Sequence, residues 1–454
     1  MKQKSSFFIS VCALAIPVTL QSMLQASFSM IDQIMIGQLG SVRVAGVGYA
    51  GKFVTAYTVI VAAVASVAGI MISQYLGQKN SQDVKRSFYL NLLIAFVVSA
   101  FFFVVCLLFP TPLMSFYTQD PAALQEASSY LSIITFTFIP TAGATLISTL
   151  LRCMEKPKLP LYASMVSAAL NTGLNYVLIF GKAGFSPMGV QGAALATVIA
   201  QVVNWLIMLL MIPRKDFLFL KTNKQKADKF NWKQYGAILL PILLCDFLWC
   251  FGENVYASIY GHMSTSSGAA MTLMNPIVIM LIGALCGLSQ AAGIIVGKLL
   301  GNKDYDEAYS ASKKLIFYGF VGSVILSIVV ALTASFYVQI YQVEETVRAL
   351  TIQILWAFAL VAPFKALNMI LSVGIIRSGG KTKYVMIVNI IGTWAIGVPL
   401  GLLSAFVWNL SIPYVYFLLS LEECVRFGLS LVVFHRKNWM QSLETTTQNT
   451  KVPA

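Results

Sequence analysis

The sequence predicts an all-α integral membrane protein with twelve transmembrane helices in two six-helix lobes related by pseudo-twofold symmetry. Three observations carry this prediction: the composition, the spacing of the apolar runs and an internal repeat. Of the 454 residues, 58% are hydrophobic and only 11% are charged, and the mean hydropathy is +0.77. A soluble domain contains about 25% charged residues. This chain has too few of them to cover a surface in water, so its solvent must be lipid.

The apolar runs have the length of membrane spans. A helix needs about 20 predominantly apolar residues to cross ~30 Å of hydrocarbon. The first run, residues 7–30, contains no Asp, Glu, Lys or Arg. No small-residue cleavage site follows a compact apolar core, so we expect a retained helix rather than a signal peptide. The twelve predicted spans are 8–36, 47–76, 88–110, 130–151, 160–181, 189–212, 235–260, 268–297, 314–340, 350–376, 384–408 and 412–434.

Proline positions predict where these spans bend. Proline removes a backbone hydrogen bond and kinks a helix interior. The prolines within or near the starts of spans are Pro17, Pro140, Pro241, Pro276, Pro363 and Pro399.

The distribution of Lys and Arg predicts the orientation. The termini and the loops on their side contain 25 of these residues, whereas the opposite loops contain Arg43, Lys182 and Arg348. Basic residues accumulate on the cytoplasmic side of membrane proteins. Both termini are therefore predicted to be cytoplasmic. The same distribution accounts for the net charge of +14 without a nucleic-acid partner.

The two halves of the chain repeat each other. The segment QYLGQKNSQD (74–83) aligns with KLLGNKDYDE (298–307) at an offset of 224, and LLRCMEKPK (150–158) aligns with IIRSGGKTK (375–383) at an offset of 225. An even number of spans per repeat gives both halves the same orientation, with a binding site between them. The predicted organisation is an N-terminal lobe (1–212), a basic cytoplasmic linker (213–234) and a C-terminal lobe (235–454).

The chain resembles the multidrug and toxic compound extrusion (MATE) family, in its DinF-like prokaryotic branch. The resemblance implies a monomeric antiporter in the inner (plasma) membrane of a prokaryote. It implies export of amphipathic, often cationic compounds in exchange for H⁺ or Na⁺, with no cofactor besides that ion. The motifs that carry the resemblance are MIDQIMIGQLG on span 1, LGQKN after span 2, LNYVLIFG on span 5, LWCFGENVYASIYGHMS on span 7, GKLLGNKDYDEA after span 8 and RSGGKTK after span 10.

The resemblance also implies an ion-coupling site. Related transporters use an acid on span 1, and Asp32 stands at the matching position. Some relatives carry a second acid on span 5, where this chain has Asn175, one helical turn after Asn171. Another branch has an essential acid on span 7, at the position of Trp249, and the family's RSGGD loop here contains Lys381. Asp32, Asn171 and Asn175 are the predicted coupling residues.

Asp32 is a candidate on its own chemistry as well. An ionisable residue within a span costs several kcal/mol and is a functional candidate by default. Asp32 lies about 36 Å along the first span, near its outer end, at about 1.5 Å per residue. Gln25, Phe28 and Ser29 share its helical face, and we expect Gln25 and Phe28 to contact substrate. The carboxylate could carry a proton or bind Na⁺. The alternative is an Asp at the interface that caps a helix or loop.

Span 7 supplies two more acids. Asp246, Trp249 and Glu253 share one helical face and could contact an organic cation through charge and the π-face of the indole. Alternatively the two acids pair with a basic residue, for which Lys365 on span 10 is the obvious partner. Asn275, which precedes Pro276, is a further candidate for the cavity.

Other side chains in the spans favour structural roles. Glu422, Glu423 and Arg426 are spaced for local ion pairs on span 12. Met271, Met274 and Met280 could line an adaptable pocket, although ordinary packing is the favoured interpretation.

Several functional classes lack their sequence signatures. The seven cysteines form no CxxC pair and there are only two histidines, so no metal site is identified. The chain has no GxxxxGK[ST] loop for an ATP-driven pump and no polar cluster typical of a membrane enzyme. A flippase for lipid-linked saccharides is the remaining alternative. A cavity that holds diphosphate would contain more cationic side chains, whereas the candidate cavity residues of this chain are mainly acidic. The sequence leaves the natural substrate and the choice of H⁺ or Na⁺ open.

Overall fold

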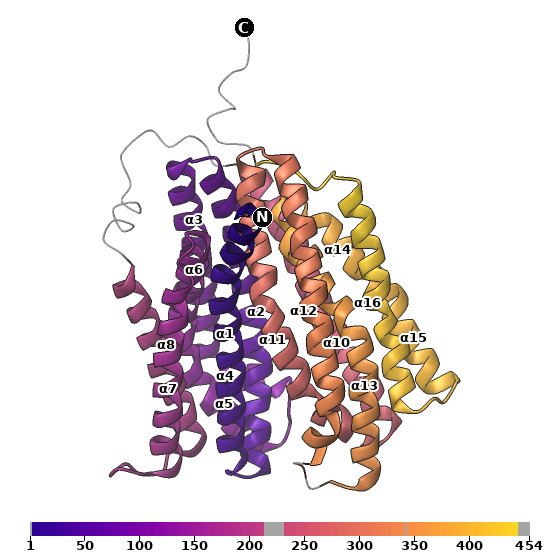
Figure 1. Ribbon diagram of the computed structural model, residues 1–454. Coiled ribbons are helices and arrows are strands. Elements are labelled where there is room, and N and C mark those ends of the chain that lie inside the picture. Colours follow the sequence, from indigo (N-terminus) through magenta and orange to yellow (C-terminus); the bar gives the residue numbers. More distant parts are fainter. Residues whose placement is uncertain (1, 213–230, 340, 342, 444–454) are drawn as a thin grey trace. The chain divides into compact units, whose positions relative to one another are not determined.

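The computed structural model describes residues 2–212, 231–339, 341 and 343–443, which are helical with short connections and contain no strand (Figure 1). Residues 213–230 of the predicted linker lie outside this part, as does Lys451. The helices of the first half are α1 (Lys2–Gly37), α2 (Ser41–Gly77), α3 (Ser81–Leu108), α4 (Pro110–Ser115), α5 (Pro121–Ile134), η1 (Thr135–Thr137), α6 (Phe138–Cys153), α7 (Lys158–Phe180) and α8 (Gly189–Met211). Those of the second half are α10 (Trp232–Met263), α11 (Thr265–Gly301), α12 (Tyr305–Gln339), α13 (Glu345–Asn368), η2 (Met369–Ile376), α14 (Thr382–Ile390), η3 (Ile391–Gly397), α15 (Val398–Leu402), η4 (Leu403–Val407) and α16 (Ile412–His435).

The predicted fold class is confirmed. Within the described residues, eleven helical stretches are long and apolar enough to cross a membrane. The fourth combines α5, η1 and α6, and the eleventh runs from α14 through η4. The twelfth predicted span corresponds to α16, which differs because it carries Glu422, Glu423 and Arg426 in its middle.

Side chains and prolines mark where several helices begin and change. Asn80 accepts a hydrogen bond from the backbone N–H of Asp83 at 3.1 Å and so caps α3. Asp120 caps α5, whose first residue is a proline. Two of the six prolines that predict bends lie where the type of helix changes. Pro140 follows the 3₁₀ turn η1, and Pro399 follows the π-helical segment η3. The remaining four prolines lie within continuous helices, at Pro17, Pro241, Pro276 and Pro363.

The chain forms two compact units. One contains Leu20–Ile72 and Asn80–Asp228, and the other contains Met1–Thr19, Ser73–Lys79 and Lys229–Ala454. We call them the N-terminal and the C-terminal unit. The start of α1 and the end of α2 thus cluster with the second half of the chain.

Each unit has its own packed interior. In the N-terminal unit the buried Tyr57 stacks on Phe138 at 4.1 Å between ring centroids and donates a hydrogen bond to the Phe138 carbonyl at 2.7 Å. In the C-terminal unit α13 packs against α12 and α16 (Figure 1), with Ile354, Phe358 and Leu419 buried between them. Lipid tails are as apolar as these side chains, so close van der Waals packing and hydrogen bonds hold the helices together.

The repeated glycines make a close crossing of α2 and α11. Gly77 at the end of α2 lies against the backbone of Lys298, and Gly301 at the end of α11 lies against the backbone of Gln74. A Cβ atom at either glycine would overlap the opposite backbone. The aligned LGQKN and LGNKD segments therefore need glycine because each helix rests on the other at this residue.

The segment that follows α16 packs against the same place. Gln74 donates to the carbonyl of Ser378 at 2.6 Å and accepts from the backbone N–H of Leu443 at 2.7 Å. Gln78 donates to the Leu443 carbonyl at 2.9 Å. Trp439 is fully buried and stacks on Phe434. These contacts fix residues 437–443 to the ends of α2 and α16.

Candidate functional site

The predicted coupling residues come together in the N-terminal unit. Asp32 on α1 accepts a hydrogen bond through Oδ1 from Asn175 Nδ2 at 2.5 Å. Asn171 lies one turn earlier on α7, with its side-chain amide 3.2 Å from Asn175 Nδ2. Thr197 on α8, which the sequence analysis did not single out, lies 3.3 Å from the Asn171 amide. These four residues form what we call the Asp32 site.

The environment of the Asp32 site is polar in an otherwise apolar interior. Asn171 and Asn175 are buried, with exposed fractions of 7% and 1%, and Asp32 is half-buried. Buried amides and carboxylates are costly unless they are hydrogen-bonded. The site meets much of this requirement by pairing polar groups from three helices, while Asn175 Oδ1 has no hydrogen-bond partner among the described residues.

The orientation of the Asn171 amide follows from its hydrogen-bond partners. With its nitrogen toward Asp32, it donates to both carboxylate oxygens at 2.9 and 3.0 Å, and its oxygen accepts from Thr197. This orientation suits an ionised carboxylate, which only accepts hydrogen bonds. With its oxygen toward Asp32, the amide would oppose both carboxylate oxygens, at 2.9 and 3.0 Å, without a donor between them. The donating orientation is therefore the favoured one.

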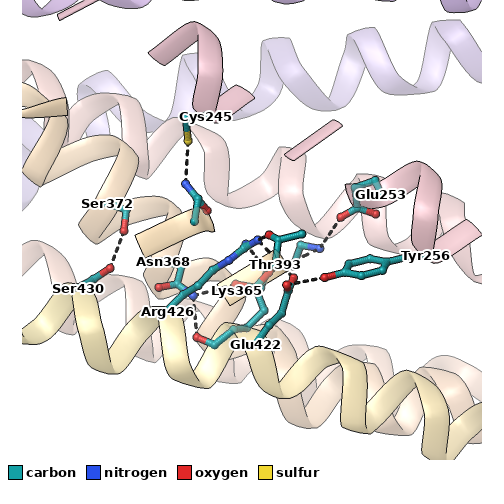
Figure 2. Close-up of polar contacts among 12 residues, drawn as sticks. Cys245, Glu253, Tyr256, Lys365, Asn368, Ser372, Thr393, Glu422, Arg426 and Ser430 are labelled. Atoms are coloured by element: carbon teal, nitrogen blue, oxygen red, sulfur yellow. Dashed lines mark hydrogen bonds and ion pairs between the residues drawn. The ribbon is translucent and has the colours of Figure 1, made fainter. Parts of the chain in front are cut away.

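A second cluster of charged residues lies in the C-terminal unit (Figure 2). Lys365 Nζ on α13 lies 3.9 Å from Glu253 Oε1 on α10 and 3.9 Å from Glu423 Oε1 on α16. Arg426 approaches Glu422 at 3.4 Å and Glu423 at 3.6 Å. The predicted local pairs on α16 are thus present. We call these five residues the Lys365 cluster.

Neutral side chains complete the hydrogen bonds of the buried acids. The Tyr256 hydroxyl donates to Glu422 Oε2 at 2.5 Å (Figure 2). Asn368 Nδ2 donates to Glu423 Oε2 at 2.8 Å. The guanidinium of Arg426 also donates a hydrogen bond to the hydroxyl of Thr393. Glu422 and Glu423 are held in place, whereas the side chain of Glu253 is 44% exposed and has fewer partners.

A small pocket opens beside this cluster. Its volume is about 110 Å³, and its walls include Glu253, Tyr260, Asn275, Lys365 and Tyr416. Pockets for drug-sized ligands occupy roughly 300–1,000 Å³. This pocket has room for an ion, a few water molecules or a head group, and not for a whole drug.

The two acids on α10 have different partners. Asp246 Oδ1 forms an ion pair with Arg377 Nη2 at 2.8 Å, away from Lys365. Burial opposes the charge of Arg377, but the charge of Asp246, the neighbouring Cys245 and the hydrogen bonds to both together raise the pKa of the guanidinium. Lys365, the partner considered for either acid, lies beside Glu253. No cluster of three or more His, Cys, Asp and Glu side chains suited to a metal ion occurs in the described part of the chain.

Of the other residues predicted to contact substrate, only Asn275 lines the pocket. Trp249, with 44% of its surface exposed, does not line it. On α1, Gln25 is exposed and Phe28 is half-buried.

Comparison with known proteins places the chain in a family. The family model described as MatE matches residues 17–177 and again residues 241–403. The chain belongs to the MatE family. The two matches begin 224 residues apart, which is the offset of the internal repeat, so each half carries one copy of the MatE domain. MatE proteins are transporters, and the chain is therefore a multi-pass membrane transporter.

The MatE relatives span nearly the whole chain. An uncharacterized transporter of Bacillus subtilis, YisQ, is 22% identical and covers 97% of each chain. A probable multidrug resistance protein, NorM, of Bacillus thuringiensis is 24% identical over 89% of this chain and 90% of its own length. A crystal structure of a MATE transporter of Vibrio cholerae matches with a TM-score of 0.87 at 17% identity, over 97% of this chain and 100% of that one. The last likeness shows the MatE fold.

The MatE repeat relates polar positions in the two units. At the offsets of 224 and 225, Gln21, Arg152 and Ser164 correspond to Cys245, Arg377 and Asn389. In the N-terminal unit Arg152 donates to Gln21 at 2.8 Å, and Gln21 donates to Ser164 at 2.8 Å. In the C-terminal unit both Arg377 and Asn389 donate to the sulfur of Cys245. The same three positions thus make the same contacts in each unit.

The repeat also relates the two candidate sites. Asp32 corresponds to Tyr256, and Thr197 corresponds to Glu422. Each MatE domain therefore has a carboxylate at this place, on the first helix of one repeat and on the sixth helix of the other. Sequence reasoning missed Thr197 and Tyr256. The repeat offset, applied to Asp32 and Glu422, would have identified both.

Proposed function

We propose that this MatE protein is a secondary active antiporter that exports amphipathic, cationic organic compounds in exchange for H⁺ or Na⁺. Its membrane is the plasma membrane of a prokaryote, with both termini in the cytoplasm. Support comes from the family and from NorM relatives named as probable multidrug resistance proteins. No covalent step is needed, so the work of the protein is to bind an ion and a compound alternately.

The Asp32 site is the observation that carries the proposal. A single half-buried carboxylate faces amide and hydroxyl groups from two other helices. A proton or Na⁺ neutralises this carboxylate. An ion drives a conformational change only if it binds one conformation more tightly than the other. Coupling therefore requires that the contacts of Asp32 with Asn171 and Asn175 differ between the two conformations.

The pocket at the Lys365 cluster supports a cationic cargo. Three carboxylates and several aromatic rings surround it. Organic cations bind to both kinds of group, through charge and through the π-face. Its small volume suits the charged head of an amphipathic compound, whose apolar part would remain outside.

A flippase for lipid-linked saccharides is the alternative within the wider superfamily. Such a protein must hold a diphosphate, which needs an excess of cationic side chains. The Lys365 cluster has three acids and two bases, and this excess of acids favours the antiporter.

Transport into inverted membrane vesicles tests the proposal. The lumen is loaded with acid in one experiment and with Na⁺ in another, and accumulation of a fluorescent cation is measured. An antiporter accumulates the dye with one of the two gradients and releases it when an ionophore collapses that gradient. The proposal fails if neither gradient drives accumulation while the protein is folded and inserted.

A further inference from the structure

Lys365 is held loosely between two acids of different exposure. Its ammonium lies 3.9 Å from a carboxylate oxygen of Glu253 and 3.9 Å from one of Glu423. Charge-assisted hydrogen bonds are shorter, at about 2.7–2.9 Å. The side chain of Glu253 is 44% exposed and that of Glu423 only 6%. The ammonium can therefore approach the buried acid when something else neutralises the exposed one.

The surroundings of Lys365 suit an ammonium guest. Tyr256, Tyr260, Tyr416 and Phe358 line the pocket together with Met271. Aromatic faces and carboxylates together bind ammonium groups, and thioethers adapt to guests of different shape. In this structure the ammonium of Lys365 lies among these groups, where the head group of a cationic guest would bind.

The charge of the cluster distinguishes it from the Asp32 site. Glu253, Glu422 and Glu423 contribute three negative charges, and Lys365 and Arg426 contribute two positive charges, so the ionised cluster carries one net negative charge. The repeat positions in the N-terminal unit that correspond to these five charged residues are all uncharged: Ser29, Pro140, Thr197, Val198 and Gln201. The bound lysine is a feature of the C-terminal unit.

We propose that Lys365 is a resident cation that limits the C-terminal pocket to guests with a single positive charge. A guest cation replaces the lysine ammonium beside Glu253, and the ammonium moves toward Glu423. One net negative charge then remains to balance the guest. A second positive charge on the guest would face Lys365 without an acid to pair with. This inference rests on the proposed function and specifies the charge of its substrate.

Binding of ethidium and propidium to the purified protein tests the inference. The two dyes share a phenanthridinium ring system, but ethidium is a monocation and propidium a dication. The wild-type protein should bind ethidium more tightly. Lys365→Met removes the resident charge with little change of shape, so the ratio of the propidium to the ethidium dissociation constant should fall by about tenfold or more, which corresponds to about 1.4 kcal/mol. Glu253→Gln in the Lys365→Met background restores one net negative charge and should restore the preference for ethidium.

Control variants distinguish the effect of the Lys365 charge from a general loss of folding. Lys365→Arg keeps the charge and should keep the wild-type ratio. Lys381→Met removes a lysine from an exposed loop and should leave the ratio unchanged. If Lys365→Met does not fold, Lys365→Gln and the single variant Glu253→Gln, which should weaken ethidium binding, provide the comparison. An unchanged dye ratio in folded Lys365 variants overturns this inference alone. Failure of the wild-type protein to bind either dye contradicts the proposed cationic cargo.

Discussion

Asp246 and Glu253 lie two turns apart on α10 and have different environments. Asp246 forms a 2.8 Å ion pair with the buried guanidinium of Arg377, whereas Glu253 faces a pocket and a lysine at 3.9 Å. An acid that neutralises a buried base stabilises the fold. An acid that faces an open pocket is available to a ligand. The same residue type therefore serves two purposes on one helix.

Substitution of the two acids should give different results. Asp246→Asn leaves Arg377 without a charged partner, and loss of a partner in a buried pair costs about 3–5 kcal/mol. We expect the lower end of this range because 27% of the Asp246 side chain is exposed. Glu253→Gln should retain stability and weaken export of cationic dyes more than of neutral ones. Thermal unfolding and dye efflux, normalised to membrane protein content, measure the two effects. Equal loss of cationic and neutral export in Glu253→Gln would assign this acid to structure or coupling.

At the level of elements, the crossing of α2 and α11 depends on the repeated glycines. Gly77→Ala places a methyl group against the backbone of Lys298, where no flexible side chain can move away. Overpacking of this kind costs about 1–3 kcal/mol. We expect a lower unfolding temperature in detergent for Gly77→Ala and for Gly301→Ala.

Gly48 provides the matched control on the same helix. A Cβ atom there meets open space, so Gly48→Ala should be neutral or slightly stabilising because alanine favours helix. If Gly77→Ala is as stable as Gly48→Ala, the two helices do not need their close approach.

Hydropathy and repeats predicted the elements well for a physical reason. Each span must satisfy its own backbone in lipid, so its existence depends on local sequence alone. The predicted span 130–151 corresponds to three elements, α5, η1 and α6, because a 3₁₀ turn precedes Pro140. The proximity of Asp32, Asn171 and Asn175 followed from the family resemblance and not from hydropathy.

The partners of the charged residues could not be predicted in the same way. Which residues face each other depends on the rotation of packed helices, and a helix that is apolar on all sides carries little information about its rotation. Sequence spacing therefore placed Asp246 and Glu253 on one face but could not assign Arg377 to the first and Lys365 to the second. Thr197 was missed because a threonine in an apolar span has no distinctive pattern.

For the whole molecule, the distribution of basic residues predicts which loops face the cytoplasm. Asp120→Cys and Ser264→Cys, each in a variant without the seven native cysteines, place a thiol at exposed helix starts on the predicted outer side. A membrane-impermeant maleimide should label both in intact cells. Asn302→Cys, on the predicted cytoplasmic side, should react only after permeabilisation. The reverse pattern of labelling would invert the proposed orientation and the direction of transport.

In the proposed mechanism, occupancy of Asp32 by an ion drives export. Asp32→Asn resembles the protonated acid in shape but can neither release a proton nor hold Na⁺ by charge. Its amide can still hydrogen-bond within the Asp32 site, so the protein should fold. The pocket at the Lys365 cluster is unaltered, so equilibrium binding of a cationic dye should persist.

The most direct test measures binding and uphill transport in the same purified Asp32→Asn protein. Dye affinity is determined in detergent, and dye accumulation is followed in proteoliposomes under an imposed H⁺ or Na⁺ gradient. Asp32→Glu, which keeps a carboxylate, serves as the conservative comparison and should retain part of the transport. We expect dye affinity close to wild type in Asp32→Asn and no accumulation against a gradient. Accumulation by Asp32→Asn at the wild-type rate would contradict this expectation and would show that the coupling carboxylate lies elsewhere.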